Sequence, residues 1–422
     1  MKKIFLDPEA SLEVLNLNEN KKTKHNPGRK SFLTSLGILS AVGFYPVQIF
    51  GINTKKEITD SLSVLKAKPY LQVSEKGKMT IRWITNMPCY SWVEFEENAD
   101  NLHERAKATN AGLVEANNTV HSITIHGLKP GGKYYYRICS KVIETFEPYN
   151  VVFGETYTSE VSSFETDKVS KDKVSFLVFN DIHDHPESIS HLLQYKTPGA
   201  KDFILMNGDI LGHTDDEGQI IRNLLEPLEG VSSHTPIVFS RGNHETRGKF
   251  ARQLHQYFNH KEQKFYFSFT VGQVYCIVLD SGEDKPDTDQ EYFGLVDFDS
   301  YRLEQAEWLK KESAKKEFKK SKYKVVFSHI PLFYSGGGHG TLHCREVWAD
   351  ILNKAKIDLM ICGHTHVSGI YPKVNGLHNF PIAIGGGPKD DTWTLIEINA
   401  DEHSLTLKII GDKGELKSEL KI

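Results

Sequence analysis

The amino-acid sequence predicts a layered α/β domain with two sheets, preceded by a small all-β sandwich domain. Short alternating runs between residues 67 and 168 indicate the first domain, and a change to strand–loop–helix alternation near Val174 indicates the second. A chain of 422 residues also has room for an N-terminal extension. We therefore divide it into residues 1–66, an export signal or anchor with a linker, residues 67–168, the sandwich, and residues 173–422, the α/β domain.

The composition is that of a globular protein with nearly balanced charge. There are 51 Lys and Arg against 55 Asp and Glu, which gives a formal net charge of -4. We also find no basic stripe with interleaved aromatic residues. The balanced charge and the lack of such a stripe both argue against a nucleic-acid-binding surface. The five cysteines form no C-x-x-C pair. Cys89 and Cys139 could pair in an exported protein, provided that the fold brings their Cα atoms together.

The N-terminal region has the layout of an export signal. A basic doublet, Arg29 and Lys30, is followed by an uncharged stretch that runs to Phe50. The segment "GRKSFL" resembles the twin-arginine export consensus, with Lys30 in place of the second arginine. We expect an exported protein, periplasmic or at the cell surface. The alternatives are an uncleaved membrane anchor, since residues 32–50 are just long enough to span a bilayer, and a buried cytosolic helix.

Residues 67–168 consist of short strands separated by turns. Residues 79–83, 91–95 and 121–125 alternate apolar and polar side chains, as half-buried strands do. A Gly/Pro turn at 127–131 then leads into an aromatic-rich strand. The run "GLKPGGKYYYRI" resembles the loop and strand of fibronectin type III domains, where a leucine and a tyrosine brace one corner. It is also similar to the N-terminal domain of purple acid phosphatases.

From Val174 onward, apolar runs alternate with helical periodicity. Five apolar runs have the composition of strands that are buried on both faces: Val174–Asn180, Phe203–Asn207, Ile237–Ser240, Lys324–Ser328 and Asp358–Cys362. Helical periodicity lies between several of them: Pro186–Tyr195, Gln219–Leu228, Lys249–Phe258 and Tyr301–Lys316. A hairpin is predicted within residues 265–280, and further strands at residues 393–398 and 404–410.

Polar side chains follow each of the five apolar runs. They are Asp181 and His183, Asp209, Asn243 and His244, His329, and His364 and His366, in that order. Residues beyond the carboxyl ends of neighbouring strands converge on one crevice, where α/β folds bind ligands. Any one of these side chains alone could be a helix cap or a turn residue. Five in order, with carboxylate, amide and imidazole donors and no thiolate, indicate a metal site.

The ordered motifs D-x-H, G-D, G-N-H-E, a single His and G-H-x-H resemble the signature of the calcineurin-like metallophosphoesterases. That resemblance implies an αββα sandwich that binds two divalent metal ions such as Mn²⁺, Zn²⁺ or Fe²⁺. It implies a first metal held by Asp181, His183, Asp209 and His366. It implies a second held by the bridging Asp209 with Asn243, His329 and His364. His244 would then stand beside the substrate as the catalytic residue.

The sequence departs from the purple acid phosphatases within these motifs. Those proteins carry a tyrosine three residues after the G-D aspartate, and it ligates ferric iron. Here that position is Gly212, and the first motif contains His183, which has no counterpart there. We therefore expect two divalent ions and no ferric–tyrosinate centre.

The function implied is a phosphoesterase in which a metal-bridging hydroxide attacks a small phosphate monoester or diester. His244 would protonate the leaving oxygen or steady the phosphoryl oxygens. Further substrate-contact candidates are His185, His213, His339 and His343. The last two lie in a glycine-rich segment that could equally be a flexible surface loop.

Two other functions stay open at this point. The same metals could serve a nucleotide or pyrophosphate substrate. The chain could also be an exported binding or adhesion protein with an inert phosphoesterase domain. Inert relatives usually lose metal ligands, and none of the expected ligands is missing from this sequence.

Overall fold

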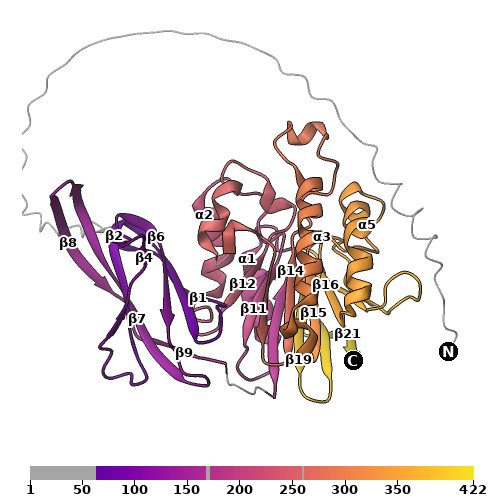
Figure 1. Cartoon of the computed structure of the whole chain (residues 1–422), viewed down its shortest axis with the longest axis horizontal. Helices are drawn as coiled ribbons and strands as arrows, with labels where there is room; N and C mark the ends of the chain where they lie inside the picture. Colours follow the sequence, from indigo (N-terminus) through magenta and orange to yellow (C-terminus); the bar gives the residue numbers. More distant parts are fainter. Residues whose placement is uncertain (1–62, 168–171, 259–260) are drawn as a thin grey trace, which may run out of the picture. The chain divides into compact units, whose positions relative to one another are not determined.

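The computed structural model describes residues 63–167, 172–258 and 261–422 (Figure 1). Its contacts group Leu62–Ile422 as one compact unit. The predicted export segment up to Phe50 and the predicted boundary between the two domains at residues 168–171 lie outside the described residues. Within the described ranges, no helix is both long enough and apolar enough to cross a membrane.

The first domain is built from antiparallel strands. Its strands are β1 (Leu65–Gln72), β2 (Lys78–Glu96), β3 (Glu104–Ala106), β4 (Thr109–Asn110), β5 (Leu113–Val114), β6 (Asn118–His126), β7 (Lys133–Glu147), β8 (Asn150–Thr158) and β9 (Ser162–Glu165). The long β2 pairs with β1, β3, β6 and β7. The Tyr134 hydroxyl accepts a hydrogen bond from the Lys129 amide at 2.9 Å, next to the buried Leu128. This tyrosine and leucine brace the corner that the fibronectin-like run predicted.

The second domain contains two sheets. The first has the order β21 (Leu416–Lys421), β20 (Leu405–Gly411), β19 (Thr394–Ala400), β10 (Val174–Phe179), β11 (Phe203–Asn207) and β12 (Ile237–Ser240). The second has the order β13 (Phe267–Val271), β14 (Val274–Leu279), β15 (Tyr323–Ser328), β16 (Leu359–Cys362), β18 (Ile382–Ile384) and β17 (Gly369–Tyr371). Strands β10–β12 are parallel to one another, as are β14, β15, β16 and β18.

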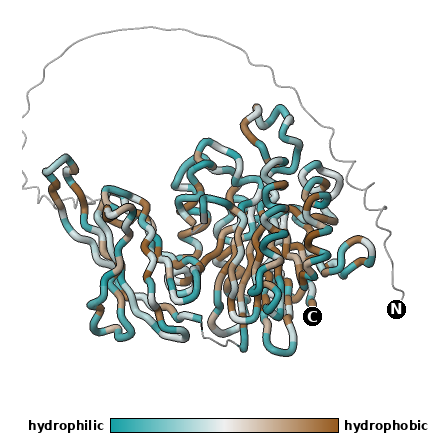
Figure 2. Tube along the Cα trace, in the orientation of Figure 1, coloured by the Kyte–Doolittle hydropathy of each residue, from teal (hydrophilic) through white to brown (hydrophobic). Residues whose placement is uncertain are grey.

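Helices cover the outer faces of both sheets. The first sheet is covered by α1 (Pro186–Leu192) and α2 (Glu217–Ile220), and α2 continues as a π-helical turn. The second sheet is covered by α3 (Phe298–Ala314) and α5 (His339–Ala355), and the short α4 (Lys316–Lys320) follows α3. Phe176, Phe203 and Phe327 pack between the two sheets. Figure 2 shows these central strands as hydrophobic and the helices as mixed. The predicted αββα layering is confirmed.

Two segments differ in detail from what their sequence patterns indicate. Residues 249–258, which show helical periodicity, contain a 3₁₀ helix, Ala251–Tyr257. The glycine-rich segment around His339 is not wholly a loop, because α5 begins at that residue and includes His343.

The cysteines are all buried and free, so Cys89 and Cys139 form no disulfide.

Strand β1 connects the two domains. It pairs in parallel with β12, where Gln72 lies opposite Ile237. The buried Tyr70 hydroxyl donates a hydrogen bond to the Tyr257 carbonyl at 2.9 Å. Ala67 and Tyr70 belong to the same buried apolar cluster as the outer face of the first sheet. The sandwich therefore supplies part of the core of the α/β domain.

Candidate metal centre

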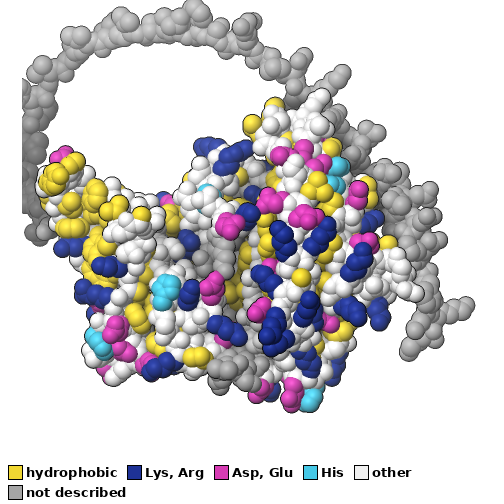
Figure 3. Space-filling view, in the orientation of Figure 1, with side chains coloured by type: hydrophobic (Ala, Val, Ile, Leu, Met, Phe, Trp, Pro, Cys, Tyr) yellow, Lys and Arg dark blue, Asp and Glu magenta, His cyan; other side chains and the backbone are white. Residues whose placement is uncertain are grey.

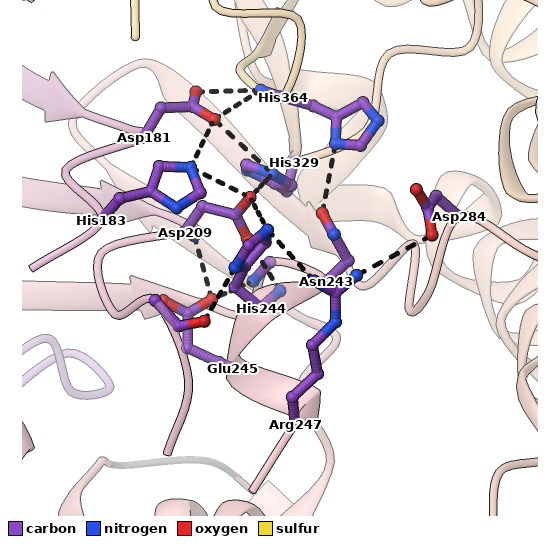
Figure 4. A network of polar contacts seen from close by, with 12 residues as sticks. Asp181, His183, Asp209, Asn243, His244, Glu245, Arg247, Asp284, His329 and His364 are labelled. Carbon is purple, nitrogen blue, oxygen red and sulfur yellow. Dashed lines mark hydrogen bonds and ion pairs between the residues drawn. The ribbon is translucent and has the colours of Figure 1, made fainter. Parts of the chain in front are cut away.

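The predicted ligands lie at the carboxyl ends of five strands, β10, β11, β12, β15 and β16, and point toward one another (Figure 4). The chain enters these positions through unusual backbone conformations. Positive φ angles occur at Asp181 (54°), His183 (45°), Asp184 (63°), Asp209 (52°), His364 (71°) and His366 (58°). For non-glycine residues each such conformation costs about 1–2 kcal/mol. Strain gathered at one place is typical of a functional site.

Three residues form the first ligand group: Asp181, His183 and His366. His366 Nε2 lies 3.3 Å from Asp181 Oδ1 and 3.1 Å from His183 Nε2. Asp181 is buried, whereas His366 is exposed to solvent. The donors therefore converge where solvent can reach them.

A second group consists of Asp209, His329 and His364. Asp209 Oδ2 lies 3.0 Å from His329 Nε2 and 3.6 Å from His183 Nε2, which belongs to the first group. One carboxylate oxygen thus faces imidazoles of both groups, as a bridging ligand would. Asn243 Oδ1 lies 3.1 Å from His364 Nδ1 and brings the amide oxygen to the second group.

The electrostatics of the two groups favour cations. Burial would raise the pKa of the Asp181 carboxyl, but His329, His183 and His366 lower it well below its usual range. Burial would also raise the pKa of the Asp209 carboxyl, but the nearby His329 outweighs burial and lowers it. The two carboxylates in turn raise the pKa of His329 to about 10 despite its burial. The site therefore favours positive charge beside two ionised carboxylates.

The donor set fits divalent metal ions. Within the described part of the chain, His329 Nε2 is buried and makes no hydrogen bond of good geometry, which is expected of a nitrogen whose lone pair binds a metal. His329 Nδ1 lies 2.9 Å from the Asn207 carbonyl, the kind of contact that orients a ligating imidazole. Burial lowers the pKa of His364 to about 4, so this ring is neutral, whereas at His329 a metal ion would take the place of the proton that the two carboxylates favour there.

Glycines in the motifs are required by close contacts. A Cβ on Gly242 would lie 2.3 Å from Asp209 Oδ1, and one on Gly363 would lie 2.3 Å from Asp181 Oδ2. Neither residue has a positive φ, so glycine is required at these two positions by lack of space and not by a left-handed backbone. Gly208, with φ of 82°, has both a left-handed backbone and a close neighbour in His329.

Glu245 organises the loops beneath the second group, a role that the sequence did not reveal. Its carboxylate accepts hydrogen bonds from four backbone amides, at distances of 2.7–2.9 Å: those of Asp209, Ile210, Leu211 and Gly242. Burial and the nearby Asp209 raise the pKa of Glu245 to about 7, while the four amides stabilise its ionised form. The strand-end loops that carry Asp209 and Asn243 are held together through this one side chain.

His244 lies next to both ligand groups and contacts the guanidinium of Arg247. Its Nε2 lies 3.9 Å from Asp209 Oδ2 and 3.2 Å from Arg247 Nη1. The guanidinium of Arg247 forms a two-point ion pair with Glu283, at 2.9 and 2.8 Å. Arg247 was not identified from the sequence, although it stands three residues after His244, just beyond the G-N-H-E motif.

The four predicted substrate histidines lie outside the two ligand groups. His185 contacts Glu187 at 3.1 Å, and His213 contacts Asp215 at 3.3 Å; both are exposed. His339 and His343 lie in the first turn and a half of α5, and both contact Asp299. Their assignment to the substrate stays a prediction.

Comparison with known proteins gives the same class. Residues 174–368 match the family described as calcineurin-like phosphoesterase, and residues 67–166 match the purple acid phosphatase N-terminal domain. Acid phosphatase type 7 of Mus musculus is 22% identical over 340 residues, which are 74% of this chain and 71% of that protein. The serine/threonine-protein phosphatase CPPED1 of Danio rerio is 32% identical over 135 residues, 31% of this chain and 41% of that protein.

A solved structure extends the comparison to the fold. The purple acid phosphatase PPD1 from yellow lupin (Lupinus luteus) seeds superposes with a TM-score of 0.63 at 15% identity, covering 84% of this chain and 73% of that one. The α/β domain is thus a calcineurin-like phosphoesterase domain. The preceding domain matches the N-terminal domain of purple acid phosphatases, and the chain is similar to these phosphatases over both domains.

Proposed function

We propose that this chain is a binuclear metal-dependent phosphatase that hydrolyses a small phosphate monoester. The observation that supports this most directly is the position of Asp209 Oδ2 between His183 Nε2 and His329 Nε2. Asp181, His183, His366 and Asp209 would hold one divalent ion, and Asp209, Asn243, His329 and His364 the other. Two such ions supply a hydroxide nucleophile at neutral pH and offset charge on the phosphoryl oxygens.

The chain's own residues would bind and orient the substrate. His244 and Arg247 present an imidazole and a guanidinium beside the ligand groups. A planar guanidinium binds phosphate oxygens through two hydrogen bonds, and Glu283 holds this one in a fixed orientation. Two cationic or hydrogen-bonding groups beside the metal ligands favour a monoester, which carries more negative charge than a diester. The relatives named as phosphatases support the same choice.

Two finer features belong to the same proposal. Gly212 has no side chain, and a Cβ there would lie 2.6 Å from Asp184 Oδ2, so this position offers no phenolate to a ferric ion. We propose two divalent ions of the Mn²⁺, Zn²⁺ or Fe²⁺ type. Export also remains part of the proposal and rests on Arg29, Lys30 and the apolar stretch that follows them.

Asp209→Asn tests the centre. It removes the negative charge that faces both ligand groups, so we expect loss of both metal ions and at least a 100-fold fall in the rate of hydrolysis of a phosphate monoester. Metal content is measured by mass spectrometry and the rate with a chromogenic ester. Asp215→Asn, an exposed carboxylate on the following loop, is the control and should change neither quantity. Full metal content in Asp209→Asn would refute the ligand assignment. A metal-loaded wild type that cleaves diesters faster than monoesters would refute the substrate class.

A further inference from the structure

A second cluster of metal-binding residue types lies at the ends of two long helices. Asp299 is in the first turn of α3, and His339 and His343 are four residues apart at the start of α5. His339 Nε2 lies 2.8 and 2.9 Å from the two carboxylate oxygens of Asp299, and His343 Nδ1 lies 3.0 Å from Oδ1. One donor atom from each of the three residues lies within 4.8 Å of the others.

The spacing of these donors suits a transition-metal ion. Histidines four residues apart on a helix present their rings on one face, and these two rings are stacked with centroids 5.6 Å apart. In a tetrahedral site with bonds of about 2.0–2.2 Å, neighbouring donors are roughly 3–3.5 Å apart. Both imidazole–carboxylate distances are close to that range, so small side-chain shifts would accommodate an ion.

One donor has no hydrogen bond. Among the described residues, His343 Nδ1 is buried and makes no hydrogen bond of good geometry, although Asp299 Oδ1 is near. A buried ring nitrogen in this state is unfavourable unless a ligand takes its lone pair. Together with the clustering, this observation points to a bound cation.

The surroundings offset the charge of such a cation. The segment from residue 283 to residue 299 contains seven carboxylates and one lysine, and Figure 3 shows acidic side chains gathered at this end of the molecule. Arg302 Nη1 donates a hydrogen bond to Asp299 Oδ1 at 2.7 Å and fixes the carboxylate, as outer partners of metal ligands do. Arg302 and the positive amino-terminal ends of α3 and α5 oppose a cation, and the acidic segment counteracts them.

We propose that Asp299, His339 and His343 bind a third divalent ion, of the kind that imidazole prefers, such as Zn²⁺ or Cu²⁺. A water molecule would complete its coordination. The site adjoins the segment that orients the Arg247 side chain. The Gly340 amide donates a hydrogen bond to the Asp284 carbonyl at 2.8 Å, and the neighbouring Glu283 pairs with Arg247. The ion would therefore steady that segment.

The test separates the third site from the binuclear centre. The full chain, without a histidine tag, is prepared as Asp181→Ala/Asp209→Ala, which disables both proposed ions of the centre. We expect this protein to keep about one tightly bound Cu²⁺ with nitrogen coupling in its electron paramagnetic resonance spectrum. Adding His339→Ala and His343→Ala should remove that ion. Adding His185→Ala and His213→Ala instead, two exposed histidines that contact other residues, should leave it in place.

Two results would overturn the proposal. One is an Asp181→Ala/Asp209→Ala protein that binds no Cu²⁺ or Zn²⁺ tightly, and the other is a bound ion that survives loss of both histidines. If the multiple variant fails to fold, His343→Gln in the otherwise native chain should weaken binding of one Zn²⁺ equivalent at least ten-fold, roughly the effect expected for a lost metal-site partner. These readouts are metal stoichiometry and spectra, so they stand even if the chain hydrolyses no phosphate ester.

Discussion

The tautomer of His244 bears on what this residue can do. Its Nδ1 lies 2.8 Å from the Gly212 carbonyl, which can only accept, so Nδ1 carries a proton. Burial lowers the pKa of His244, and the neutral ring then has a lone pair on Nε2, where Arg247 Nη1 donates at 3.2 Å. To protonate a leaving group, Nε2 must first gain a proton and lose this contact with the guanidinium. To steady a phosphoryl oxygen through Arg247, Nε2 needs neither to gain a proton nor to lose its contact with the guanidinium.

His244→Ala separates these roles. If His244 protonates the leaving oxygen, turnover of an alkyl phosphate should fall roughly 10²–10⁴-fold, and turnover of a nitrophenyl phosphate much less, because nitrophenolate departs without a proton. If His244 only positions Arg247, the two esters should lose similar factors. Steady-state rates with both esters, together with metal analysis, distinguish the roles.

Arg247 supplies the matched control for His244. In the positioning role, His244→Ala should add little to the loss already caused by Arg247→Ala, because both changes remove one unit. Fully multiplied losses would show that the two side chains act independently. Loss of metal from His244→Ala would instead show that it supports the ligand Asn243.

At the scale of elements, the parallel strands were predictable and their coverings less so. The five strands are continuous apolar runs, and each motif residue must follow its strand, so strand ends and candidate ligands emerge together. The start of α5 was not found, because Gly336, Gly337 and Gly338 indicate a loop and the helix begins directly after them. Glu245 and Arg247 were missed because their roles depend on backbone amides and a carboxylate that are distant in sequence.

A buried ion pair ties β19 to the loop before β11. Glu397 is fully buried in β19 and pairs with Lys201, and it accepts a hydrogen bond from the Thr197 amide at 3.1 Å. Burial would raise the pKa of Glu397, but Lys201 and Thr197 together lower it below its usual value. The ion pair therefore stabilises the fold above the unfolded-state pKa of about 4.3, and this stabilisation is lost as the pH falls through the lower folded-state pKa.

Glu397→Gln should lower the free energy of unfolding by about 3 kcal/mol at pH 7, because it leaves Lys201 charged and buried without its partner. The difference from the wild type should shrink as the pH falls below about 4. Urea unfolding at both pH values measures this. Asp391→Asn, which breaks an exposed pair with Lys413, is the control and should have little effect. A Glu397→Gln penalty that is the same at both pH values would contradict the assigned ionisation.

At the scale of the whole molecule, the two domains share one core. The Tyr70 ring and hydroxyl are buried against the segment that contains Tyr257, and Arg82 donates to the Phe258 carbonyl at 3.0 Å. Strand β1 also covers the edge of β12. The sandwich is thus part of the structure on which the ligand-bearing strands depend, even though it provides none of the proposed ligands.

A chain that begins at residue 173 should therefore be less stable than one that begins at residue 63. The shorter chain leaves β12 as an open edge and uncovers the apolar surface beneath Tyr70, so we expect a lower melting temperature and self-association. Thermal unfolding and size-exclusion chromatography of the two chains provide the measurement. A monomeric short chain with an unchanged melting temperature would show that β1 contributes nothing.

The strained backbone of the ligand loops has a consequence for amide exchange. Residues such as Asp181, His364 and His366 hold conformations that an L-amino acid normally avoids, and bound cations would help to keep them there. After chelation, the loops should open more often, so deuterium uptake in a peptide spanning residues 363–367 should rise while strand β11 stays protected. Equal uptake with and without chelator would mean that packing alone holds the loops. Otherwise, the backbone itself reports metal occupancy, with no substrate required.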